Sequence, residues 1–81
     1  MRVTSVQVRM ARAALNRTVW DLTEATGLHR NTITNIEVGR YARHQKTLKT
    51  LEIIEAVLRR AGVEFIDENG EGARRADEEV A

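Results

Sequence analysis

Apolar residues recur every three or four positions near the start of the chain, the spacing that gathers them on one face of a helix. Val8, Ala11 and Leu15 form this stripe. Thr4, followed three residues later by Gln7, makes a capping box, in which each residue satisfies a free backbone N–H of the other at a helix start. The pattern therefore predicts a first helix from Thr4 to about Leu15.

Two further short helices are predicted between residues 18 and 38. Thr18 is a favourable N-cap for the second helix, and Gly27 stands where a left-handed residue ends it. Leu28 is expected to pack back into the core, and the third helix runs from Arg30 to Val38. The inward positions of these two helices are expected to be Leu22, Ala25, Ile33 and Ile36.

A longer fourth helix is predicted from about Lys46 to Arg60. Its apolar positions are Leu48, Leu51, Ile54, Val57 and Leu58. Ile53 and Val57 fall away from the main stripe, so they either widen the core or form a contact with another subunit.

The spacing of apolar and polar residues changes after the fourth helix. Val63 to Ile66 combines β-branched and aromatic residues with one polar interruption and predicts a short strand. Residues 71–81 offer no apolar run to pair with it. We therefore expect an all-α, four- to five-helix domain with a short C-terminal β-strand over residues 1–66, followed by an acidic flexible tail over 67–81.

The composition of the 81 residues excludes several classes of protein. Cysteine is absent and the two histidines, His29 and His44, are far apart, so we expect no disulfide, metal or other cofactor. With one serine, no apolar carboxylate pair and no glycine-rich phosphate loop, we do not expect an enzyme. No apolar run suits a membrane span or a leader peptide, and a bacterial or phage-encoded cytoplasmic protein is the simplest expectation.

The net charge of +1 hides an uneven distribution along the chain. Residues 1–50 carry a net charge of +6 and residues 51–81 a net charge of −5. A basic first half is suited to a polyanion such as nucleic acid, although solvated helix faces are the ordinary alternative.

Residues 18–39 have the arrangement of a helix-turn-helix, two short helices joined through a glycine. The outward side chains of the second of these helices are polar and free of acids: Arg30, Asn31, Thr34 and Asn35, with Thr32 at the flank. Arginine and asparagine are suited to paired hydrogen bonds with guanine and adenine edges in the major groove. The motif therefore predicts base reading by this helix.

Over about residues 4–66 the chain resembles the Xre-type helix-turn-helix family, which comprises lambda-repressor-like and Cro-like DNA-binding proteins. The resemblance is carried by L-T-E-A-T-G-L-H-R-N-T-I-T-N-I-E-V-G at 22–39 and by A-G-V-E-F-I-D-E-N-G at 61–70. It implies a structural ion pair between Arg12 and Glu37, base contacts from Arg30, Asn31 and Asn35, and backbone contacts after the third helix. With the basic residues near the motif, the expected phosphate-binding set is Arg17, Thr18, His29, Thr32, Arg40, Tyr41, Arg43 and Lys46.

The chain also departs from the family pattern. Val19 replaces a glutamine that contacts phosphate in the family, and the second C-terminal strand of related proteins is missing from the pattern here. Trp20 is expected to pack at the edge of the core rather than to stack on DNA. His29 is either a helix cap or a DNA contact, and Arg40 is either a DNA contact or an ordinary loop charge.

Two functions remain open from the sequence. The first is a sequence-specific regulator of transcription, a repressor or autoregulator that binds a palindromic operator as a homodimer. We expect its dimer interface at Ile53, Val57, Val63, Phe65 and Ile66, where an unpaired strand would meet the same strand of a second copy. The alternative is an antitoxin-like module that binds a partner protein through its C-terminal strand or tail, with DNA binding secondary.

Overall fold

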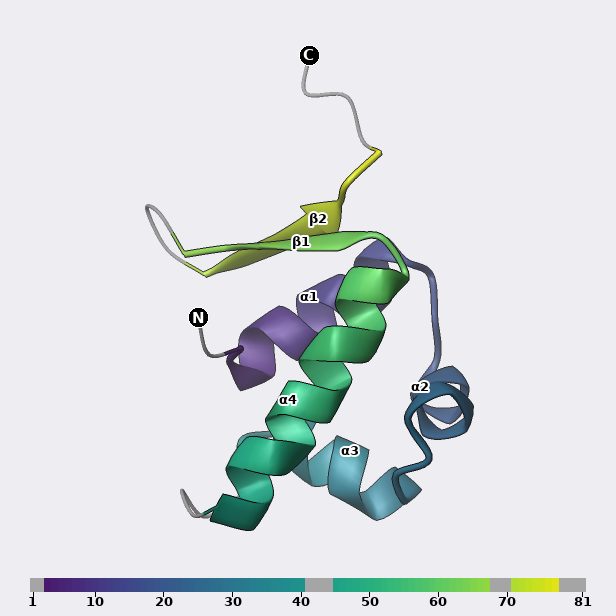
Figure 1. Ribbon diagram of the computed structural model, residues 1–81, viewed down its shortest axis with the longest axis vertical. Helices are drawn as coiled ribbons and strands as arrows, with labels where there is room; N and C mark the ends of the chain where they lie inside the picture. Colours follow the sequence, from purple (N-terminus) through teal and green to yellow (C-terminus); the bar gives the residue numbers. More distant parts are fainter. Residues whose placement is uncertain (1–2, 41–44, 68–70, 78–81) are drawn as a thin grey trace.

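Four helices and a two-stranded antiparallel sheet form the part of the chain that the computed structural model describes, residues 3–40, 45–67 and 71–77 (Figure 1). The elements are α1 (Ser5–Ala14), α2 (Val19–Thr26), α3 (Arg30–Glu37), α4 (Gln45–Arg60), β1 (Val63–Ile66) and β2 (Gly72–Arg75). The predicted helices and the strand at 63–66 are confirmed to within about two residues. The all-α class is wrong, because the chain adds a β-hairpin to its helices.

The helix boundaries follow from local chemistry that is visible in the sequence. Thr4 and Thr18 each form a complete capping box, with Gln7 and Asp21 respectively. Gly27 ends α2 with a φ of 74°, in the left-handed region that a side chain disfavours. These caps fix where α1 and α2 begin and where α2 stops.

The core lies between the helices and under the sheet. Its buried members are Val3, Val8, Ala11, Leu22, Ile33, Ile36, Leu51, Ile54, Leu58 and Val63. Ala25, expected to face inward, is exposed. Of the α2 residues, only Leu22 is buried, with Val19 three residues before it and Thr26 four residues after it half-buried beside it. Thr26 tolerates this position because its hydroxyl donates to the Leu22 carbonyl at 2.6 Å.

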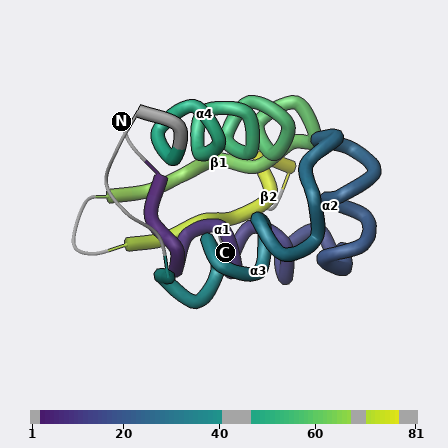
Figure 2. Tube along the Cα trace, turned by 90° about the horizontal axis from the view of Figure 1, so that it is seen from below, coloured from purple at the N-terminus to yellow at the C-terminus, as the bar shows by residue number. Residues whose placement is uncertain are grey.

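The second strand, β2, overturns the expectation that β1 has no partner in this chain. Val63 pairs with Arg75 and Ile66 with Gly72. The tail prediction is therefore wrong for residues 72–75. The sequence does not predict β2 because G-A-R-R has no alternation of apolar and polar residues. Backbone pairing with β1 and the packing of Ala73 on the core hold this strand in place. Figure 2 shows β2 lying along α1, with β1 between β2 and α4.

Gln7 joins the hairpin to the first helix. Its side chain is buried, at 1% exposure. The amide Nε2 donates to the Ile66 carbonyl at 3.0 Å and to the Gly72 carbonyl at 3.2 Å, one from each strand. Its Oε1 meanwhile accepts from the Thr4 N–H at 3.1 Å, so every hydrogen-bonding group of this amide has a use. One side chain thus caps α1 and holds both strands at their turn end.

Candidate nucleic-acid interface

The turn between α2 and α3 leaves one face of α3 on the surface. Leu28 packs against the core just after Gly27, and Ile33 and Ile36 bury the opposite face of α3 at 0% and 2% exposure. The polar positions of α3 predicted to read bases are all exposed: Arg30, Asn31, Thr34 and Asn35. Thr32 at the flank is half-buried. The exposed face carries no acid, because Glu37, the acid that ends α3, is turned inward.

His29 is the N-cap of α3, and this position determines which ring nitrogen accepts a hydrogen bond. Its Nδ1 accepts from the Asn31 backbone N–H at 3.1 Å. A nitrogen that accepts carries no proton, so the neutral ring carries its proton on Nε2. The imidazole is exposed, and its Nε2–H is a donor beside the polar face of α3. Capping and an outward contact are therefore compatible in one side chain.

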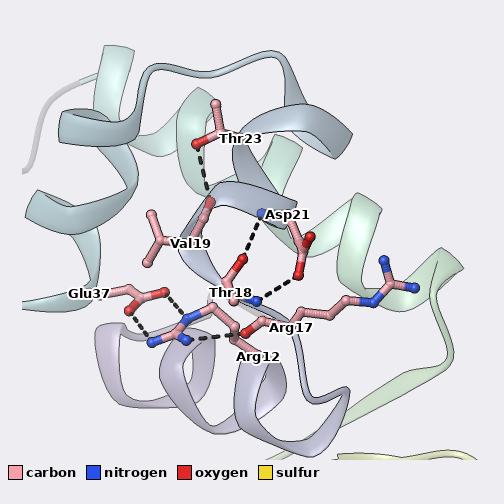
Figure 3. A network of polar contacts seen from close by, with 7 residues as sticks. All are labelled: Arg12, Arg17, Thr18, Val19, Asp21, Thr23 and Glu37. Carbon is pink, nitrogen blue, oxygen red and sulfur yellow. Dashed lines mark hydrogen bonds and ion pairs between the residues drawn. The ribbon is translucent and has the colours of Figure 1, made fainter.

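The predicted ion pair between Arg12 and Glu37 is confirmed, and it is bidentate (Figure 3). Arg12 Nε donates to Glu37 Oε2 at 2.8 Å and Nη2 to Oε1 at 2.9 Å. The hydrogen bond to Glu37 raises the pKa of Arg12, outweighing desolvation. Nη1 also donates to the Arg17 carbonyl at 3.1 Å. One guanidinium thus ties α1 to the end of α3 and to the loop before α2.

The side chain and the backbone N–H of Thr18 both form hydrogen bonds with Asp21 in the capping box (Figure 3). Its Oγ1 accepts from the Asp21 N–H at 3.1 Å, and its own N–H donates to Asp21 Oδ2 at 2.8 Å. This backbone hydrogen bond is the main cause of a lowered pKa for the exposed Asp21 carboxyl. The hydroxyl proton of Thr18 is not used by the cap, so an outward donor persists at the start of α2.

The basic residues expected to bind phosphate are only partly described. Arg17 and Arg40 are exposed, one before α2 and the other after α3. The Arg40 N–H donates to the Asn35 carbonyl at 2.8 Å, which ties its backbone to the end of α3. Tyr41, Arg43 and the side chain of Lys46 lie outside the described residues.

Trp20 does not pack at the core edge as expected. It is 60% exposed, because the inward residues of α2 are Val19 and Leu22. It stands in the first turn of α2, the end nearest Arg17. No sequence signal distinguishes this exposed position from a packed one, since a tryptophan in a short amphipathic helix is ordinarily buried against the core.

The residues expected at a strand-mediated dimer interface differ widely in their exposure. Val63 is in the core at 3% exposure, and β1 already has a partner strand. Phe65 and Ile66 are half-buried, and the guanidinium of Arg59 covers the Phe65 ring at 5.2 Å from its centre. Only Ile53 is clearly exposed, at 42%, with Val57 half-buried beside it. The expectation that β1 has no partner strand in this chain is therefore wrong, and the edge of β1 that faces β2 is already paired.

Within the described part of the chain, no helix has the length and apolar character needed to cross a membrane. Comparisons of the sequence with protein-family models and with curated proteins found no match in either case.

Proposed function

We propose that the chain is a sequence-specific, double-stranded DNA-binding regulator of transcription, of the Xre helix-turn-helix type, that inserts α3 into the major groove. The observation that carries the proposal is the exposed face of α3, polar and free of acids over a buried apolar face. A helix of about 10–12 Å diameter fits a major groove about 12 Å wide. Arg30 would donate to guanine, and Asn31 or Asn35 would pair with adenine.

Donors around this face would hold the sugar-phosphate backbone. The Nε2–H of His29 and the hydroxyl of Thr18 lie at the starts of α3 and α2. A helix N-terminus adds backbone N–H groups that favour an anionic oxygen. Arg17 and Arg40 add charge on either side. These contacts would set the register of α3 on the duplex without reading sequence.

A single helix-turn-helix reads only a few base pairs, so an operator with two half-sites about 34 Å apart would give useful affinity. Occupying such an operator would block transcription, including that of the regulator's own gene. The cytoplasm of a bacterium or of a phage-infected cell is the compartment that this proposal implies.

The partner-binding alternative is weakened. It used the C-terminal strand or the tail as the contact, and of these β1 is paired along one edge with β2. Pairing with β2 gives β1 a partner within this chain, so one edge of β1 does not need a second protein to complete it.

Selection from a pool of random duplexes, followed by fluorescence anisotropy on the enriched sequence, tests the proposal. We expect one motif to be enriched and to bind at least about 1,000-fold more tightly than unrelated duplex at the same salt. Asn31→Ala should lower this preference, while Arg9→Ala, at an exposed position on α1, should leave it unchanged. A pool that yields no motif, with all duplexes binding equally, would contradict the proposal.

A further inference from the structure

The outer face of α4 carries an open hollow that the core does not use. It is lined by Lys49, Glu52, Ile53, Ala56, Val57 and Arg60. The core side of the same helix is formed by Leu51, Ile54 and Leu58, all buried. Ile53 is 42% exposed, although a large apolar side chain gains nothing from facing water. α4 therefore has a second stripe, opposite its core face, that no described residue covers.

Two charges on this stripe lie at equal distances from Ala56, while Lys49 lies three residues before the acidic one. Glu52 is four residues before Ala56, and Arg60 is four residues after it. Both are exposed, and neither forms an ion pair with a described residue. The neighbouring Glu55 and Arg59 pair with each other at 2.9 Å, so they do not compete for these two charges. A segment with an acid four residues before Ala56 and a base four residues after it is complementary to an inverted copy of itself.

We propose that a second copy of this chain packs its α4 antiparallel on this stripe, with the twofold axis at Ala56. The arrangement brings Glu52 against Arg60 of the partner subunit, and the symmetry repeats the contact. Ala56, the smallest side chain of the hollow, lies where the helix axes are closest. The side chains of Ile53 and Val57, on either side of Ala56, are then removed from contact with water.

The charges also select this register over its neighbour. An axis midway between Ile53 and Ala56 would bury the apolar residues equally well. It would, however, bring Lys49 against Arg60 of the partner subunit, a like-charge contact made twice. The register centred on Ala56 avoids that repulsion and replaces it with attraction.

One pair of helices buries less than the roughly 1,200 Å² of a standard stable interface, so the dimer in free solution should be weak. Its use at an operator rests on the proposed function, because two half-sites on one duplex raise the local concentration of the second copy. Dimerisation without DNA does not depend on that function and can be measured separately.

Analytical ultracentrifugation of the full chain without DNA tests the interface. The wild type should show a reversible monomer–dimer equilibrium at up to about 1 mM protein. Arg60→Glu and Glu52→Arg each place like charges at both contacts and should weaken the dimer about tenfold or more. Mixing the two variants should restore association as a heterodimer, because both contacts become attractive again. The double variant in one chain should dimerise as the wild type does.

Arg9→Glu is the matched control, since it makes the same change of charge on the exposed surface of α1. It should leave the dimer unaffected, and far-UV circular dichroism checks that each chain is folded. A monomeric wild type at these concentrations, a single reversal without effect, or a mixture that stays monomeric would each overturn the interface. Binding to a duplex with one half-site is measured in parallel, so that loss of the dimer is distinguished from loss of DNA binding.

Discussion

Replacing Gln7 by leucine should remove a large part of the stability of this small protein. Leucine fills a similar volume but has no polar group. The change leaves the Thr4 N–H and the carbonyls of Ile66 and Gly72 without their side-chain partner. The two strands then lose their polar link to α1, and the capping box loses one of its two bonds.

The cost follows from the burial of the site. A polar group left unsatisfied in the interior costs about 1–3 kcal/mol, and the three hydrogen bonds at this site are only partly buried. For three groups we expect a loss of about 2–4 kcal/mol, from a total of roughly 4–12 kcal/mol for a chain of this length. Because 1 kcal/mol shifts the Tm of such a domain by about 4–8 °C, the Tm should fall by at least about 8 °C.

Urea unfolding followed by circular dichroism measures this loss, and Thr4→Ala is the comparison, because it removes the cap alone and should cost about 1 kcal/mol.

Gln7→Glu adds a pH test. Facing two carbonyl oxygens in a buried site raises the pKa of the introduced carboxyl above the unfolded value of about 4.3. The charged form of the introduced carboxyl therefore lowers the free energy of unfolding at a pH above its folded pKa. This loss decreases as the pH falls from the folded pKa to the unfolded one, and it is absent at lower pH. A Gln7→Leu chain within about 0.5 kcal/mol of wild type, the usual range for surface substitutions, would refute the reasoning.

Three further outcomes are expected. The affinity for DNA should fall by about 0.9 log units per decade of salt for each phosphate contact, and an affinity independent of salt would exclude phosphate binding. Arg12→Ala removes the guanidinium that pairs with the Glu37 carboxylate, which is only 7% exposed. Urea unfolding should show a free energy of unfolding lower by about 2–3 kcal/mol, less than for a fully buried pair because Arg12 is 28% exposed. Because the Asp21 pKa is lowered in the folded chain, its contribution to stability is present above the unfolded value of about 3.9 and is lost as the pH falls through the folded one. Asp21→Asn should therefore flatten the acid limb of the stability curve, and an unchanged limb would exclude this carboxyl as a source of the acid dependence.

The helices could be predicted because their signals are local. Thr4, Thr18 and Gly27 act on residues within one turn of themselves, so their roles follow from spacing alone. The ion pair of Arg12 with Glu37, 25 residues apart, came instead from the family resemblance, because spacing does not show which helix faces meet.

What the sequence did not show depends on long-range contacts of weakly patterned residues. β2 has no apolar alternation, and its place is set by backbone pairing with β1 and by an amide of Gln7 that is 65 residues from Gly72. The exposure of Trp20 likewise depends on which side of α2 docks, a choice made by the tertiary packing of Leu22. Because the sequence does not predict β2, it predicts a subunit contact at β1, and the exposed Ile53 on α4 is only one part of that expected interface.

The base preference of an Arg30→Ala chain tests the central claim most directly. The measurement is the affinity of wild type and variant for the selected operator and for each of its single-base substitutions, at one salt concentration. We predict a loss of about 1–3 kcal/mol on the operator, confined to the base pair that Arg30 reads, so that substitutions at this pair no longer weaken binding. If Arg30→Ala lowers every affinity equally and leaves the ranking of the operators unchanged, α3 does not read the bases and the account is wrong.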